Sequence, residues 1–118
     1  MENEDEDPYG FIAKRDGERD LRFDGYLLGQ ASSEHGSNGQ HTRWTEIKIF
    51  RTKGEQYVVA VLGLTQWEGE HGRYSAKVCQ TPEEVVTYLT QEERGLSWLA
   101  KEAIEAAGLW EAAVEAVD

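Results

Sequence analysis

The sequence predicts an α+β fold, in which an antiparallel meander sheet of three to five strands is followed by C-terminal helices packed on one face. Three observations predict it. Segments with strand-like alternation or an unbroken apolar character occupy the first two thirds of the chain, up to residue 79. Turn-forming residues separate these segments without a helical crossover, which favours antiparallel neighbours. Helical periodicity begins only at residue 81 and continues to the end.

Length and composition indicate one small domain. The 118 residues fit a single core, and 39% of them are hydrophobic. We expect residues 1–8 to form a disordered acidic arm and residues 9–118 to form one α+β domain. We find no apolar run of about 20 residues for a membrane span and no secretory signal. The single cysteine, Cys79, excludes an internal disulfide, so a cytoplasmic location is expected.

The net charge of −11 is concentrated at the two ends of the chain. Residues 1–7 contain five acids and no base, and residues 92–118 contain seven acids and two bases. The part between them is nearly neutral, with eleven acids and ten bases. Such a chain is repelled by nucleic acid unless a local basic face overrides the overall field.

Five segments have the composition of strands, and they are residues 9–14, 21–29, 44–51, 57–64 and 73–79. The segment 57–64 is apolar on both faces, which predicts the middle of a sheet covered on both sides. In 44–51, Ile47 and Ile49 share one face, while Trp44 and Phe50 share the other with polar residues, so that second face is not simply exposed to water. Between these two strands, Gly54 is suited to a positive φ in a hairpin turn.

The helical part begins with the clearest local signal in the chain. Thr81 is a suitable N-cap, Pro82 fits the first turn, and Glu84 completes a capping box. A second helix follows Gly95, and its apolar stripe consists of Leu96, Leu99, Ala100, Ala103 and Ala107. Gly108 is expected to end it before a short helical piece over residues 110–117.

Three segments resemble a bacterial protein family. Residues 22–29, Arg-Phe-Asp-Gly-Tyr-Leu-Leu-Gly, resemble its "RFxGxLLG" strand, and residues 49–59 resemble its "YRTxxGRYVV" hairpin. The C-terminal Glu-Ala-Val-Asp resembles the Glu-x-Leu-Asp-Ile ending of the EXLDI family. The resemblance covers residues 21–118 and implies a related fold without an activity. Family members often carry an N-terminal segment that looks like a DNA-binding arm, whereas this chain has the acidic residues 1–8 in its place.

The features together favour a non-catalytic protein-interaction or regulatory module. Trp98 falls outside the apolar stripe of its helix, beside Glu102 and Glu105, and Trp44 lies on a polar strand face. Rigid aromatic side chains of this kind anchor protein interfaces. The expected partner is a protein, which includes a second copy of the chain. No cofactor is expected, and Cys79 is interpreted as a small buried hydrophobe rather than a nucleophile.

Two alternatives remain open. A nucleic-acid-linked role would use the basic strand 43–53, with Arg43, Lys48 and Arg51, or acidic mimicry through the glutamates Glu102, Glu105, Glu111 and Glu115. A metal-dependent enzyme would use His35, His41 and His71, because two Glu-His-Gly tripeptides occur in loops that emerge at the same end of a meander sheet.

Overall fold

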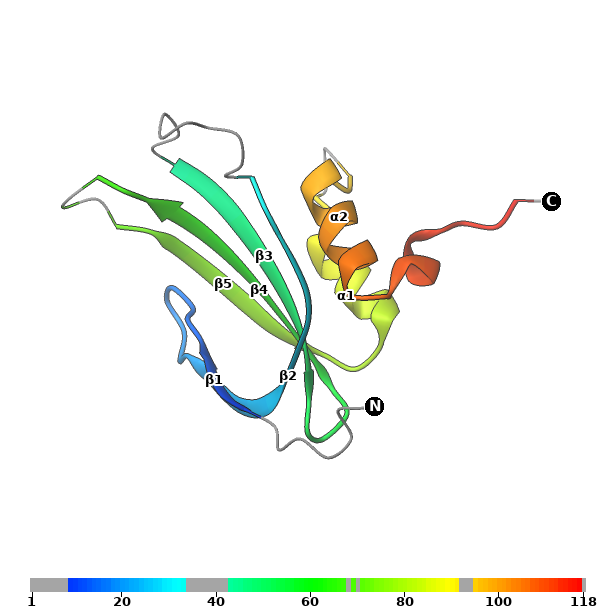
Figure 1. Ribbon diagram of the computed structural model, residues 1–118, viewed down its shortest axis with the longest axis horizontal. Helices are drawn as coiled ribbons and strands as arrows, with labels where there is room; N and C mark the ends of the chain where they lie inside the picture. Colours follow the sequence, from blue (N-terminus) through cyan, green and yellow to red (C-terminus); the bar gives the residue numbers. More distant parts are fainter. Residues whose placement is uncertain (1–8, 34–42, 68, 70, 92–94, 118) are drawn as a thin grey trace.

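The computed structural model describes residues 9–33, 43–67, 69, 71–91 and 95–117. It confirms the α+β fold: five strands form one antiparallel sheet in the order β1-β2-β3-β4-β5, followed by helices (Figure 1). The elements are β1 Tyr9–Ala13, β2 Leu21–Ser32, β3 Arg43–Thr52, β4 Tyr57–Thr65, β5 Arg73–Cys79, α1 Pro82–Leu89, α2 Trp98–Ala106 and the 3₁₀ helix η2 Trp110–Ala113. Both helices lie on one side of the sheet, against β2, β3 and β4. The expected arm, residues 1–8, lies outside the described residues.

The strand β4 is interior but not central, since it lies between β3 and the edge strand β5. Its first half, residues 57–60, is buried on both faces, as the apolar run predicts. Val59 packs toward the helices, while Val58 and Ala60 belong to a second core on the opposite face. Residues 61–65 are only half-buried, and hollows border this end of the sheet.

The turn between β3 and β4 corrects one expectation. The positive φ falls on Glu55 (φ 68°) and not on Gly54. The Glu55 amide donates to the Thr52 carbonyl at 2.9 Å, and the Gln56 amide donates to Thr52 Oγ1 at 2.9 Å. These two hydrogen bonds close the turn around Thr52 and place the left-handed residue one position later than the glycine.

Side-chain caps begin both helices. Thr81 Oγ1 accepts from the Glu84 amide at 3.2 Å, and the Glu84 carboxylate accepts from the Gln80 amide at 2.8 Å, one residue earlier than in a standard capping box. Ser97 Oγ accepts from the Ala100 amide at 3.0 Å and caps α2.

The second helix is shorter than its stripe suggested, and Gly108 (φ 77°) follows its end. Ile104, which the predicted stripe omits, is fully buried and adds to the core beneath α2. The C-terminal piece is also shorter than expected, because η2 ends at Ala113 and the following residues are not helical. Near its C-terminal end, the backbone of α2 packs directly onto Gly29 of β2.

The sheet curls into a half-barrel on the side away from the helices (Figure 1). A register shift between Leu27 and Gly29 bends β2, as a β-bulge does. The rings of Phe11, Phe23 and Phe50 then pack against one another with centroids 4.7–5.5 Å apart. The curl brings the β1–β2 turn back to the far edge strand.

At that edge the turn and β5 are joined by two hydrogen bonds. The Asp16 amide donates to the Tyr74 carbonyl at 2.9 Å, and the Tyr74 amide donates to Asp16 Oδ2 at 2.9 Å. Residues that are 58 positions apart in the chain therefore hold the half-barrel in its curved shape.

Candidate functional site

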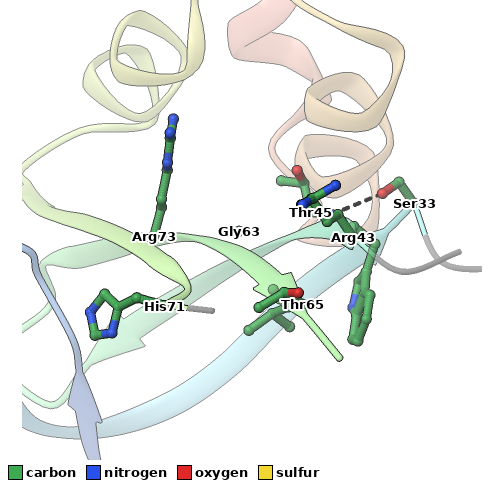
Figure 2. A pocket seen from close by; sticks show the side chains of 9 residues that line it. Ser33, Arg43, Thr45, Gly63, Thr65, His71 and Arg73 are labelled. Carbon is green, nitrogen blue, oxygen red and sulfur yellow. Dashed lines mark hydrogen bonds between the residues drawn. The ribbon is translucent and has the colours of Figure 1, made fainter. Parts of the chain in front are cut away.

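A pocket of about 600 Å³ opens at the end of the sheet where the β2–β3 and β4–β5 connections emerge. A meander brings these two connections to the same end, as the sequence predicts. The described lining residues come from the ends of β2, β3, β4 and β5, and they are Ser33, Arg43, Trp44, Thr45, Gly63, Leu64, Thr65, His71 and Arg73 (Figure 2).

Two arginines give the pocket its charge. Arg43 and Arg73 extend from β3 and β5 toward the side of the sheet that carries the helices (Figure 2). The registers Arg43↔Thr65 and Gly63↔Arg73 place them on either side of β4, offset by two residues. Strand spacing and rise then put their Cα atoms about 12 Å apart. Among the described lining residues of this pocket none is acidic, in a chain of net charge −11.

Backbone pairing holds the rim of the pocket in place. The Ser33 amide donates to the Thr45 carbonyl at 2.9 Å, and the Thr45 amide donates to Ser33 Oγ at 2.9 Å (Figure 2). The pair extends the β2–β3 ladder by one residue and fixes the Ser33 hydroxyl oxygen as an acceptor. The hydroxyl proton of Ser33 then points elsewhere, because the lone pair facing Thr45 is occupied.

A second hollow of about 510 Å³ continues from the pocket toward the helices. The two share Ser33 and Thr45, and the second is lined in addition by residues at the C-terminal side of α1 and the start of α2, among them Gln91 and Trp98. Its described lining contains no charged side chain. We call the two hollows together the helix-side groove. It has arginines at one end and a tryptophan at the other.

The predicted partner residues on α2 form one exposed row. Trp98 is 60% exposed, and Glu102 and Glu105 are also exposed. Positions four and seven residues apart lie on one face of a helix, so the two glutamates follow Trp98 away from the groove. Trp67 and Trp110 are exposed as well, at 54% and 41%. Three of the four tryptophans are therefore exposed.

Trp44 does not join this row. It is half-buried, and its indole Nε1 donates to Glu46 Oε2 at 3.2 Å. Strand alternation directs both side chains to the face away from the helices. Trp44 borders the pocket but lies on the opposite side of the sheet from Trp98.

The structure does not bring the three basic residues of 43–53 together. Arg43 and Arg51 share the helix side but stand at opposite ends of β3, about 26 Å apart at the usual strand rise. Arg51 lies over the Tyr57 ring at 4.5 Å and within 3.8 Å of Glu55. Lys48 lines a cavity on the other face. The residue that does accompany Arg43 is Arg73, which the sequence analysis missed.

The register between neighbouring strands would have predicted that Arg73 lies near Arg43. The alternation of 73–79 already showed that Arg73 shares a face with Ser75 and Lys77. Pairing this strand with 57–64, and 57–64 with 44–51, puts Arg43 and Arg73 on the same side of the sheet.

The predicted metal residues are only partly described. His35 and His41 lie outside the described residues, and within the described ranges no group of three or more metal-ligating side chains occurs. His71 is 86% exposed and lies 4.0 Å from Asp16 Oδ1. In Figure 2 it points away from the two arginines.

Cys79 is fully buried, as expected for a small hydrophobe. Burial raises the pKa of its thiol, and the Glu84 carboxylate adds to the rise while Lys77 opposes it. The thiol is therefore protonated at neutral pH and is a poor nucleophile.

The sequence matches no protein-family model and has no significant similarity to a curated protein or to a solved structure. The resemblance to the EXLDI family stays a prediction. In the part of the chain that is described, no helix is long and apolar enough to span a membrane.

Proposed function

We propose that the protein is a non-catalytic interaction module whose helix-side groove binds an acidic segment of a partner protein in the cytoplasm. One observation carries the proposal: Arg43 and Arg73 extend to the same side of the sheet, in a pocket with no acidic side chain among its described lining residues. Guanidinium groups bind carboxylates with two parallel hydrogen bonds, so two of them suit a chain with spaced acidic residues.

The rest of the groove suits a polypeptide. The hollow toward the helices is lined by hydroxyl, amide and apolar groups, with Trp98 exposed at its end. An aromatic side chain beside a polar groove supplies contact area at a low entropic cost. Beyond Trp98, the exposed Glu102 and Glu105 favour a basic residue of the partner. The expected segment is therefore acidic at the arginine end and basic near α2.

Defined peptides test the proposal. The probes are a short peptide in which glutamates alternate with leucines and its glutamine analogue, titrated by fluorescence anisotropy. The acidic peptide should bind more tightly, and its affinity should fall as salt rises. Arg73→Gln or Arg43→Gln should weaken binding about tenfold, the loss expected for one charge-assisted hydrogen-bonded contact. Arg22→Gln is the matched control, since Arg22 is exposed at the opposite end of the sheet.

Trp98→Ala should weaken binding and leave the fold intact, because the side chain is 60% exposed. Trp110→Ala on η2 controls for the loss of an exposed indole. Equal binding of both peptides, or unchanged binding by the two arginine variants, would contradict the proposal. Tighter binding of a single-stranded oligonucleotide would favour the nucleic-acid alternative instead. A salt-sensitive dimer that dissociates on Arg73→Gln would make a second copy the partner.

A further inference from the structure

The face of the sheet away from the helices contains a separate cavity of about 330 Å³. Its walls are mostly apolar, and the main contributors are Phe11, Phe50, Ala60, Leu62 and Leu64. The register explains why it is hollow. Lys48 pairs with Ala60, which pairs with Ala76, so a row of small side chains on β4 and β5 lies between the larger rows of Phe50 and Leu62.

The half-barrel encloses this row. The β1–β2 turn reaches β5 through the Asp16–Tyr74 hydrogen bonds, and Tyr74 lines the cavity. At its rim, Ile12 is 59% exposed and Leu27 is 42% exposed. Two apolar side chains exposed beside an apolar cavity mark a site for an apolar group.

The only charged side chains in the described lining are two lysines, Lys14 and Lys48. Lys48 is half-buried within the curved face, and Lys14 Nζ lies 5.4 Å from the centre of the Tyr74 ring. Glu46 shares this face by alternation, but it accepts from the Trp44 indole and does not line the cavity. Ammonium groups beside an apolar cavity are best compensated by an anion that carries an apolar body.

We propose that this cavity binds a free alkyl carboxylate of medium length. At roughly 30 Å³ for each non-hydrogen atom, the volume holds about eleven such atoms, which is close to a ten-carbon carboxylate. The alkyl chain packs against Phe11, Phe50 and Leu62, and the carboxylate accepts hydrogen bonds from Lys48 and Lys14. This site is distinct from the helix-side groove, because the two open on opposite faces of the sheet and share only Leu64 among their described lining residues.

Titration with decanoate tests the proposal. Calorimetry gives the affinity, and methyl NMR locates the ligand through the Leu27 and Leu62 signals, which belong to residues that line this cavity and not the helix-side groove. Decanoate should bind with a dissociation constant below 1 mM and shift these methyl groups. Lys48→Met, which keeps the length of the side chain and removes its charge, should weaken binding about tenfold or more. Lys14→Met should weaken it in the same direction. Lys77→Met is the control, because Lys77 is exposed on β5 outside the cavity lining.

Decyltrimethylammonium has the same chain with the opposite charge and should bind much more weakly than decanoate. Ala60→Leu should block both ligands by filling the cavity. If that variant does not fold, the lysine variants still decide the question. Decanoate that fails to bind below 1 mM, binds equally to the double variant Lys14→Met/Lys48→Met, or shifts only methyl groups beside α1 and α2 would overturn the proposal. Arg73→Gln should leave decanoate binding unchanged, so failure here is distinguishable from failure of the peptide test.

Discussion

The contact between Gly29 and α2 predicts a large effect from one methyl group. A Cβ at Gly29 would lie 2.4 Å from the Ala107 nitrogen and 2.5 Å from the Ala106 carbonyl carbon. These are backbone atoms, so they move only with the end of the helix. Ordinary van der Waals contact begins near 3.4 Å, and the end of α2 must therefore shift by about 1 Å in Gly29→Ala.

That shift disturbs the core beneath α2, where Ala103 and Ile104 are fully buried. Overpacking of this kind costs about 1–3 kcal/mol. We expect about 2 kcal/mol, which lowers Tm by roughly 10 °C in a domain of this size. Thermal and urea unfolding measure both quantities.

Gly63→Ala is the matched control for this variant. A Cβ at Gly63 would meet only ordinary contacts, the nearest being Arg73 Cβ at 3.5 Å. Its stability should stay within about 0.5 kcal/mol of the parent protein. If Gly29→Ala proves as stable as Gly63→Ala, the close approach of α2 to β2 is wrong. The outcome also bears on the groove, because Trp98 is carried by the same helix.

Two further predictions concern Asp16 and Cys79. Asp16→Ala removes the acceptor for the Tyr74 amide, so hydrogen exchange at that amide should accelerate about fivefold or more, while exchange at the Ile49 amide should not change. Asp16→Asn keeps an acceptor, so its Tyr74 amide should exchange at close to the parent rate. Equal exchange rates in all three proteins would refute the contact. Burial raises the pKa of the Cys79 thiol above its ordinary value of 9.0, so the stability it contributes is complete below pH 9 and is lost as the pH rises through the raised folded-state value. The free energy of unfolding should therefore fall above pH 9 more steeply in the parent protein than in Cys79→Ala, and parallel pH profiles would show that the thiol does not contribute.

Much of the fold was predictable because local patterns and tertiary packing agree. Three signals depend only on residues that are close together in the chain: the alternation around Ile47 and Ile49, the unbroken apolar run 57–64, and the cap at Thr81. The strands and both helices follow from these signals. Ile104 was one exception, since the predicted stripe was drawn too narrow for a helix that is covered on one side by the sheet.

The curl of the sheet was not predictable in the same way. It depends on a register shift between Leu27 and Gly29 and on contacts among Phe11, Phe23 and Phe50, which come from three strands. The sequence did show that the face of Trp44 and Phe50 is not simply exposed, but it did not show what covers it. Sequence reasoning therefore missed the cavity between Lys14 and Lys48.

The candidate groove was half predictable. Meander topology was enough to bring the ends of β2, β3, β4 and β5 together. Meander topology alone did not identify Arg73 as the neighbour of Arg43. The sequence analysis grouped Arg43 with Lys48 and Arg51 because the three residues lie close together along one strand. Because side chains alternate along a strand, Arg43 and Lys48 lie on opposite faces of the sheet. Arg51 lies on the same face as Arg43 but at the other end of the strand.

The paired hydrogen bonds between Asp16 and Tyr74 have a consequence for self-association. An open sheet ends in a row of unused amide and carbonyl groups to which a foreign strand can add. At Tyr74 both groups are already taken by the chain's own turn. An incoming strand therefore cannot pair with Tyr74 without first displacing Asp16, so this end of β5 is protected against the addition of a foreign strand.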